Sequence, residues 1–352
     1  MNSGEVFINY QMSKRVMRRT HSPKKLLEIY SKKYANWIVP FLKEYGVEKA
    51  PSMLCCHTLH QLPAFFKIHP NCVFVADYYL HLFLYDLNFC LCDQRFEEYL
   101  VNLYIKTYAE KAFLNKRIEM CYYLCLTSDG LEEYKLEANY RDDSLMTQLV
   151  EQTDIQEEFT FLHEAAHYLV TLTDDIKKTD IYQTLKVTFS SVIDLELDDD
   201  FYEESYCDYL GVVYILNKSY HKTELSHELY FTLLFRTLSG IYAIQLAEKC
   251  QHTEKESVYL MQDKQMYLLM LRFGSLYSAI YEFLAKHNPN ELMLLSDVFE
   301  KSRDELTELT RSLCRMSYNF ENEFVNDHDM VESVSEHEML TFIYDFLKLY
   351  QD

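Results

Sequence analysis

The scarcity of glycine and proline is the feature that most constrains the fold of this chain. Its 352 residues include only 6 Gly and 6 Pro, whereas average usage of these residues is roughly 7% and 5%. Folds built from many short strands need both residues at their turns. The sequence therefore predicts a mostly α (α+β) protein with long helices. Because 49% of its residues are hydrophobic and 25% are charged, the chain can bury a sizeable core.

The spacing of apolar residues predicts the main elements of this fold. In chain order they are a helix over 23–45, a short strand over 72–75 leading into a helix that ends near 89, a helix over 97–113, a buried strand over 120–126, extended structure over 185–197, a helix from 201 to about 218, and long helices after 224 with breaks near 251–255, 287–290 and 326–329. No repeat or flexible linker marks a sharp domain boundary. We therefore expect an N-terminal mostly helical region with a basic arm (1–130), a metal-site core (131–222) and a C-terminal helical region (223–352), with one compact unit as the alternative.

The charge distribution bears on the partners of the protein. The formal net charge is -21, which argues against nucleic acid because phosphate binding depends on clustered Lys and Arg. Residues 1–50 contain ten Lys or Arg and four Asp or Glu, so this segment alone carries about +6. We expect the basic segment from Lys14 to Lys33 to be a solvated helix face that docks on the acidic body; a nucleic-acid or membrane contact is the alternative.

Cysteine usage and hydropathy bear on the cellular location. None of the 10 Cys has CxxC spacing, and no segment resembles a secretory signal peptide. No stretch approaches the ~18 uninterrupted apolar residues that a membrane helix needs. The sequence therefore predicts reduced thiols, a cytoplasmic location and no membrane span.

The segment FTFLHEAAHYLV, residues 159–170, contains an HExxH motif in an apolar helical setting. His163 and His167 are one helical turn apart on the same face, so both can reach one zinc ion at about 2.1 Å. Glu164 projects beside them, where its carboxylate can accept a proton from a zinc-bound water and later deliver it to a leaving amine. Burying three ionisable groups in a core is costly unless something such as a metal compensates.

A second motif lies in DFYEESYCDYLG, residues 200–211. Asp200 and Glu203 suit the start of a helix, on which Glu204 and Asp208 share one face. Together with HExxH, this segment resembles the ExxxD element of the gluzincin metallopeptidases, and the trailing Gly211 fits the ExxxDxxG form of some of them.

The resemblance implies a zincin-like core, in which the HExxH helix lies under a small sheet, and it implies hydrolysis of peptide bonds. It makes His163, His167 and Glu204 the zinc ligands. It also makes Glu164 the general base and acid, and Asp208 the partner of a ligating His, where a carboxylate improves the ligand. Glu203 remains an alternative third ligand.

The mechanism also needs a group that stabilises the oxyanion. No sequence feature identifies it, and Arg236 and His227 are the candidates considered. The expected substrate is a protein or peptide inside the cell.

Two other functions stay open. Glu164–His167 and Glu224–His227 are both ExxH motifs, as in ferritin-like di-iron proteins. However, a helical hairpin would bring Arg236 level with Glu204 and leave Glu224 about 18 Å away or more. A zincin-like module that binds a partner without cleaving it is the other alternative.

Overall fold

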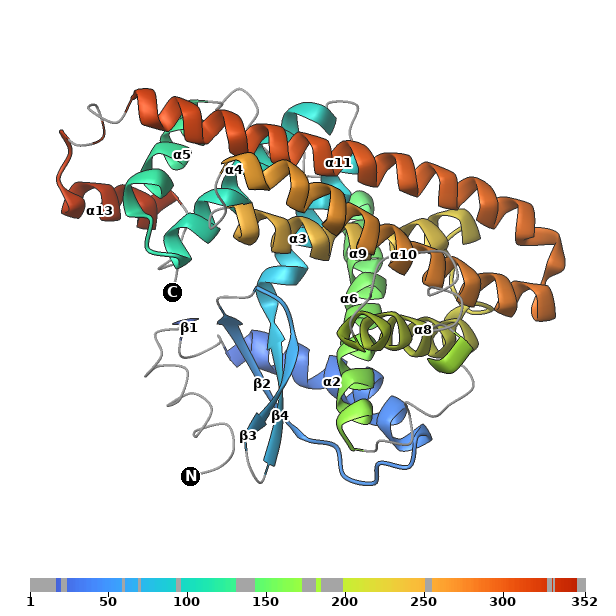
Figure 1. Cartoon of the computed structure of the whole chain (residues 1–352). Helices are drawn as coiled ribbons and strands as arrows, with labels where there is room; N and C mark the ends of the chain where they lie inside the picture. The colour runs from blue at the N-terminus through green and yellow to red at the C-terminus, as the bar shows by residue number, and fades with distance from the viewer. Residues whose placement is uncertain are drawn as a thin grey trace. The chain divides into compact units, whose positions relative to one another are not determined.

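A computed structural model describes most of the chain as helix with one small sheet (Figure 1). The described residues are 17–19, 24–58, 61–68, 71–92, 96–130, 143–172, 182–184, 199–250, 255–327, 331 and 333–346. The main elements are β1 (Met17–Arg19), α2 (Lys24–Glu44), β2 (Ser52–Thr58), β3 (Ala64–Ile68), β4 (Asn71–Asp77), α3 (Tyr78–Cys92), α4 (Phe96–Leu114), α5 (Ile118–Gly130), α6 (Asp143–Leu172), α8 (Asp199–Ser219), α9 (His227–Cys250), α10 (Lys255–His287), η3 (Pro289–Glu291), α11 (Leu292–Asn326) and α13 (Glu336–Phe346). The prediction of a mostly helical fold with a small sheet is confirmed.

The chain divides into two compact units. Unit 1 comprises Met1–His81, Asp154–Leu238 and Tyr267–Glu305, and unit 2 comprises Leu82–Thr153, Ser239–Met266 and Leu306–Asp352. Each unit draws on the N-terminal, middle and C-terminal parts of the chain. The sequence predicted three consecutive regions (1–130, 131–222 and 223–352) instead. That division into domains stays a prediction.

The small sheet in unit 1 has the strand order β1-β2-β4-β3. Strand β2 pairs parallel with β4, and β3 pairs antiparallel with β4. Val73 and Val75 of β4 are fully buried, and Leu54 and Phe66 from the neighbouring strands pack against them. Because side chains alternate along a strand, these valines share one face. Phe74 and Ala76 on the opposite face are also fully buried, so β4 is covered on both faces.

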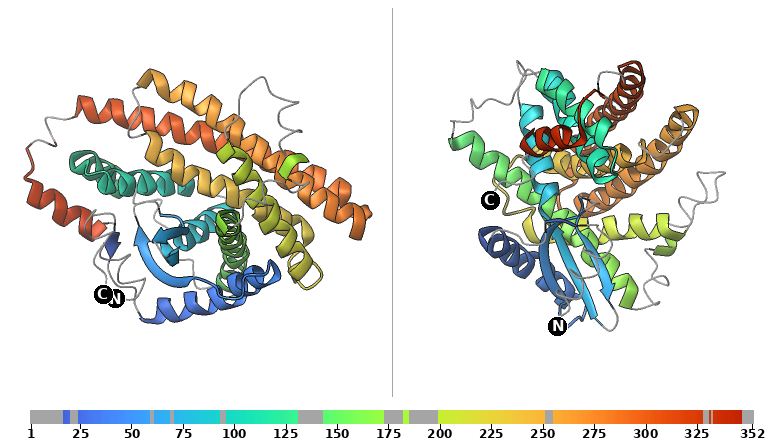
Figure 2. Two further views of the ribbon diagram at one scale, coloured as in Figure 1. Left: turned by 60° about the horizontal axis from the view of Figure 1, so that its bottom comes forward. Right: turned by 90° about the vertical axis from the view of Figure 1, so that its left-hand side faces the viewer.

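An aromatic cluster joins α2, β4 and α6 within unit 1. The ring of Phe161 on α6 lies 6.1 Å from that of Tyr30, 5.5 Å from that of Trp37 and 4.9 Å from that of Phe74, centroid to centroid. Figures 1 and 2 show α2 and the green part of α6 beside the strands. Phe161 is fully buried and precedes His163 by two residues. The helix segment that carries the HExxH motif is therefore anchored by packing on both α2 and the sheet.

Most of the predicted helices are confirmed, but the predicted buried strand over 120–126 is wrong. That segment belongs to α5, and it buries Met120, Cys121, Leu124 and Cys125. A short continuous apolar run is compatible with either a buried strand or a buried helix, and helical packing decides here. Strands β1, β2 and β3 were not predicted. The extended structure predicted over 185–197 lies outside the described residues.

Two described segments are long and apolar enough to cross a membrane, judged by length and composition alone. They are His227–Lys249 in α9 and Met266–His287 in α10, of which 78% and 44% are buried in the protein. Core helices of compact proteins meet the same criteria. The expectation that the chain has no membrane span therefore stays a prediction.

A buried ion cluster connects α2 with α6. Glu157 is fully buried, and its carboxylate accepts hydrogen bonds from the Tyr30 hydroxyl at 2.9 Å and from the Lys33 ammonium. Lys33 also donates to Asp154 at 2.7 Å, and His81 Nδ1 lies 2.8 Å from Glu157 Oε2. Lys33 is the last residue of the segment Lys14–Lys33, which was expected to be a helix face that docks on the acidic body. Within that segment Lys33 contacts acids, but Met17–Arg19 forms a strand, and residues 14–16 and 20–23 lie outside the described residues. Burial acts to raise the pKa of Glu157, but His81 and Lys33 outweigh burial and lower it.

This lowered pKa predicts how stability depends on pH. A carboxyl group whose pKa is lower in the folded than in the unfolded state stabilises the fold above its ordinary pKa of 4.5, and that contribution is lost as the pH falls through the lowered value. We expect Glu157→Gln to lower the free energy of unfolding at pH 7 by about 3 kcal/mol, because it breaks a buried ion pair. Urea unfolding should show the difference from wild type narrowing below about pH 4.5. The exposed Glu151→Gln is the control, and a pH-independent difference for Glu157→Gln would contradict the argument.

Candidate metal centre

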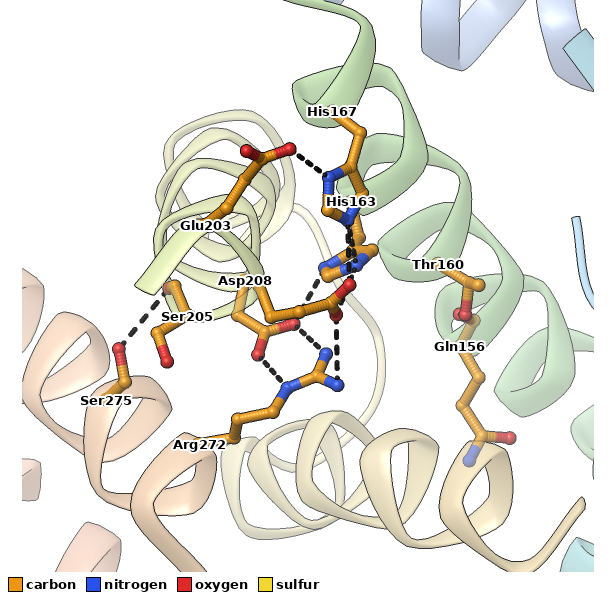
Figure 3. A network of polar contacts seen from close by, with 10 residues as sticks. Gln156, Thr160, His163, His167, Glu203, Ser205, Asp208, Arg272 and Ser275 are labelled. Atoms are coloured by element: carbon orange, nitrogen blue, oxygen red, sulfur yellow. Dashed lines mark hydrogen bonds and ion pairs between the residues drawn. The ribbon is translucent and has the colours of Figure 1, made fainter. Parts of the chain in front are cut away.

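Two helices of unit 1 supply the groups that converge at the candidate centre. His163, Glu164 and His167 lie on α6, and Glu203, Glu204 and Asp208 lie on α8. Figure 3 shows His163 and His167 extending from α6 toward α8. On α6 the neighbours of this motif are buried apolar residues: Phe159, Phe161, Leu162, Ala165 and Ala166. The polar groups are thus set into a packed segment of helix, where the surrounding side chains fix the backbone that carries them.

Three potential ligand groups meet at one point. His163 Nε2 and His167 Nε2 lie 3.1 Å apart. The carboxylate of Glu204 faces both rings: its Oε2 lies 3.3 Å from His163 Nε2, and its Oε1 lies 3.2 Å from His167 Nε2. Ligands of a tetrahedral zinc ion with bonds of about 2.0–2.1 Å are about 3.3–3.4 Å apart. The three donor groups therefore lie at separations that suit a single small ion, and they form a candidate metal cluster.

The outer nitrogen of each imidazole faces a carboxylate. His163 Nδ1 lies 2.8 Å from Asp208 Oδ1, and His167 Nδ1 lies 3.1 Å from Glu203 Oε1. An Nδ1–H that faces a carboxylate leaves Nε2 as an acceptor in the neutral ring. Two ring nitrogens and one carboxylate then point their lone pairs at one another. Such an arrangement requires a cation between them, which can be protons or a metal ion.

The same contacts distinguish Glu203 from Glu204. Glu204 lies on the Nε2 side of both imidazoles, whereas Glu203 contacts the Nδ1 side of His167. The structure thus places Glu204 among the potential ligands and Glu203 beside a ligand. The contact between Glu203 and His167 was missed in the sequence, where Glu203 had been considered only as a helix cap or as a rival ligand.

Arg272 is a further member of the cluster that the sequence reasoning missed. It extends from α10, and its Nε and Nη2 donate to Asp208 Oδ2 and Oδ1 at 2.7 and 2.9 Å (Figure 3). Its third nitrogen, Nη1, lies 3.2 Å from Glu204 Oε2. A signal was present in the sequence, because Arg272 is the only Lys or Arg between Lys264 and Lys286. An arginine isolated in an apolar helix needs a buried acid as its partner.

The pKa shifts reflect the concentration of charge. Burial acts to lower the pKa of His163, but Asp208 and Glu204 outweigh burial and raise it. Burial likewise acts to lower the pKa of His167, yet the hydrogen bonds that its ring makes to its neighbours, Cys207 and Glu203 first among them, raise it. Burial acts to raise the pKa of Glu204 and of Asp208, but Arg272 and the histidines outweigh it and lower both. These shifts favour the protonated form of both imidazoles and the ionised form of both carboxylates.

Glu164 differs from the other acids of the cluster. Burial raises its pKa, although His167 and His163 act in the opposite direction. Among the described residues, no hydrogen bond or ion pair engages its carboxylate, whereas Glu203, Glu204 and Asp208 are all engaged. Its carboxylate is therefore the one in the cluster that remains available to a water molecule or a substrate.

The two residues considered for oxyanion stabilisation have other partners. Arg236 pairs with Glu305 through Nε and Nη2, both at 3.1 Å. His227 Nδ1 lies 2.7 and 2.9 Å from the two oxygens of Glu291, and its ring stacks on that of Tyr220. In the part of the chain that the structure describes, neither residue contacts the cluster, so the structure does not bring them together with the other predicted site residues.

Gly211 allows the two helices to approach closely. A Cβ at this position would lie 3.3 Å from the backbone nitrogen of His163, 3.5 Å from the ring of Phe159 and 3.6 Å from Leu162 Cβ. The closest of these atoms belongs to a helix backbone, which cannot rotate away as a side chain can. The absence of a side chain on α8 therefore sets the distance between Gly211 and His163.

Comparison with known proteins finds no match among family models, curated proteins or solved structures. The geometry of the cluster is thus the basis for any functional assignment.

The close approach at Gly211 predicts a contrast between two glycines. Gly211→Ala should destabilise the fold by about 1–3 kcal/mol, because the added methyl group overpacks the contact between α6 and α8. At Gly274 on α10 a Cβ would meet nothing within 4 Å, so Gly274→Ala should stabilise the helix by about 0.5–1 kcal/mol. Urea unfolding of the two variants measures the contrast, and equal stabilisation of both would show that Gly211 does not limit the approach.

Proposed function

We propose that the protein is a zinc-dependent metallopeptidase with a zincin-like core. The observation that carries the proposal is the convergence of His163 Nε2, His167 Nε2 and the Glu204 carboxylate at separations of 3.1 to 3.3 Å. Two imidazoles and one carboxylate are the protein ligands of many catalytic zinc sites, which keep the fourth position for water. Calcium and magnesium prefer sites made of oxygen ligands, so the two nitrogen donors favour zinc.

Each residue of the cluster has a distinct part in this proposal. Bound zinc would polarise the scissile carbonyl and lower the pKa of its water. Asp208 and Glu203 hold the imidazoles of His163 and His167 through their Nδ1 atoms, which orients both rings and increases their basicity as ligands. The Glu164 carboxylate accepts a proton from water and then donates it to the leaving amine. Burial raises the pKa of the Glu164 carboxyl above its ordinary value, which favours a group that both accepts and returns a proton.

The alternative of a di-iron protein finds less support. It would need the second ExxH motif, Glu224–His227, in the same cluster. Among the described residues, the cluster includes His163, His167 and Glu204, whereas His227 is engaged by Glu291. The alternative of a silent binding module would leave the uncommitted carboxylate of Glu164 without a role. We therefore favour hydrolysis.

The substrate class follows from the reaction and remains part of the proposal. A protein or peptide inside the cell is the proposed substrate, in a cytoplasmic location where the thiols stay reduced. The net charge of -21 makes nucleic acid an unfavourable partner.

The proposal predicts that substitutions of two adjacent glutamates, Glu203 and Glu204, affect zinc binding differently. Wild-type protein should bind one zinc per chain, and Glu204→Ala, like His163→Ala or His167→Ala, should abolish stoichiometric binding because only two protein ligands remain. Glu203→Ala is the matched control, and it should keep one zinc while weakening affinity roughly 10- to 100-fold through its contact with His167. Elemental analysis after dialysis, followed by titration against a competing chelator, separates these outcomes. Zinc lost from Glu203→Ala and retained in Glu204→Ala would reverse the ligand assignment.

The proposed mechanism makes a separate prediction for Glu164. Glu164→Gln should keep zinc and fold but lose at least about 100-fold in turnover, because an amide cannot accept the proton. The measurement is mass spectrometry of the new amino termini that wild type and variant generate in a library of peptides. Undiminished cleavage by zinc-loaded Glu164→Gln would exclude the mechanism, and a wild-type protein that binds zinc without cleaving would favour the binding module.

A further inference from the structure

A single guanidinium bridges the two acids on which the candidate metal centre depends. Arg272 uses Nε and Nη2 for Asp208 and Nη1 for Glu204. We propose that Arg272 is a positioning residue of the centre, whose planar fork holds Glu204 in place as a ligand relative to Asp208 and His163. This inference rests on the proposed zinc site and adds to it a third helix, α10.

The contacts show why an arginine suits this task. The guanidinium is planar, and its donors have fixed directions, so one side chain can hold two carboxylates in a set relation. Asp208 is fully buried and also contacts His163 Nδ1 at 2.8 Å. Arg272 therefore takes its own orientation from an acid that is already held by α6. The third donor then acts on Glu204, whose side chain is 39% exposed and lacks the constraint of complete burial.

Glu204 is the ligand that most needs such support. Its carboxylate lies at the end of a side chain with three rotatable bonds, whereas both imidazoles are held by Nδ1 contacts. Arg272 Nη1 contacts Oε2, which also lies 3.3 Å from His163 Nε2, and Oε1 faces His167 Nε2 at 3.2 Å. A guanidinium on one oxygen limits rotation of the carboxylate, so both oxygens stay directed toward the two Nε2 atoms. The proposed role is thus to reduce the conformational freedom that metal binding would otherwise have to remove.

The position of α10 supports the same role. One turn beyond the guanidinium, the Ser275 hydroxyl donates to the backbone carbonyl of Ser205 at 3.4 Å, next to Glu204 (Figure 3). Arg272 itself is only 15% exposed. Two residues of α10 therefore contact the stretch of α8 that carries the acids: Arg272 binds two carboxylates, and Ser275 donates to a backbone carbonyl.

Arg272 can affect zinc affinity in two ways, because its guanidinium positions Glu204 but also repels a metal ion. The test must separate these two effects. Replacement by glutamine removes the repulsion together with the fork, so its two effects on affinity oppose each other. Arg272→Lys keeps the charge and loses the fork, since an ammonium cannot hold two carboxylates in a fixed relation. The lysine variant therefore reports on positioning alone.

Arg236 offers a matched control within the same unit. It pairs with Glu305 through the same two nitrogens, and its side chain is also 15% exposed. Arg236→Lys should thus lose a comparable fork and comparable stability without affecting the metal. A general structural effect would change zinc affinity equally in both lysine variants, whereas a positioning effect is confined to Arg272.

The experiment is a zinc titration against a chromophoric chelator at one pH, with wild type, Arg272→Lys and Arg236→Lys. We expect Arg272→Lys to weaken zinc affinity roughly 10- to 100-fold and Arg236→Lys to leave it within about twofold of wild type. Equal affinities of the two variants would overturn the role of Arg272 while leaving the zinc site intact. A wild-type protein that takes up no zinc would overturn the proposed function itself.

Folding is monitored by circular dichroism in the same samples. If Arg272→Lys is unfolded without metal, it is refolded with zinc present and titrated in the same way. Weakened affinity after refolding supports the proposal, and wild-type affinity overturns it. Failure to refold with zinc, while Arg236→Lys folds, would assign Arg272 to the stability of the fold and overturn its role at the metal centre.

Discussion

The buried carboxylate of Asp208 is the point on which the arrangement of the candidate centre depends. It is held by His163 from α6 and by Arg272 from α10, and it lies itself on α8. A carboxylate without solvent contact is stable only when its charge is paired and its lone pairs accept hydrogen bonds. Arg272 pairs the charge and donates to both oxygens, while His163 Nδ1 approaches Oδ1 to 2.8 Å. Together these contacts fix the relative positions of three helices. The convergence of the ligand atoms a few ångströms away follows from this triple contact.

Among the described residues, two groups of acids and histidines have the spacing to hold a metal ion, one around His163 and one around Glu157, and they compensate charge in different ways. Around Glu157 the ammonium of Lys33 contacts the carboxylates of both Glu157 and Asp154 and so compensates their charge within the protein. At the other cluster Arg272 contacts Glu204 Oε2, which also lies 3.3 Å from His163 Nε2, and no described Lys or Arg lies between the two Nε2 atoms and Glu204 Oε1. The geometry of the nearest fixed cation thus distinguishes a structural ion cluster from a candidate metal centre.

Close packing holds the segment of α6 that carries His163 and His167 in a fixed position, although the chain has very few glycines. Helices α6 and α8 come together at Gly211, where a side chain would press against the backbone of His163. On its other side α6 packs through Phe161 against α2 and β4. The motif-bearing segment is therefore held between rigid contacts, and a site held on packed helices keeps its geometry better than one on loops.

The sequence by itself determined the features that depend on local spacing. The low content of Gly and Pro indicated long helices, and the spacing of four residues placed His163 and His167 on one face of α6 and Glu204 and Asp208 on one face of α8. These relations follow from helix geometry, which needs no knowledge of the rest of the chain. They were sufficient to select the two potential histidine ligands and to favour Glu204 over Glu203.

Tertiary structure alone decided what depends on contacts between distant segments. The apolar run around Cys121 suits a strand or a helix, and packing made it α5. No local pattern links Arg272 to Asp208, 64 residues away along the chain, or assigns Glu203 to the outer nitrogen of His167. Both pairings arise because packing brings α6, α8 and α10 together, and a buried charge must then be paired with whichever opposite charge the neighbouring helix presents.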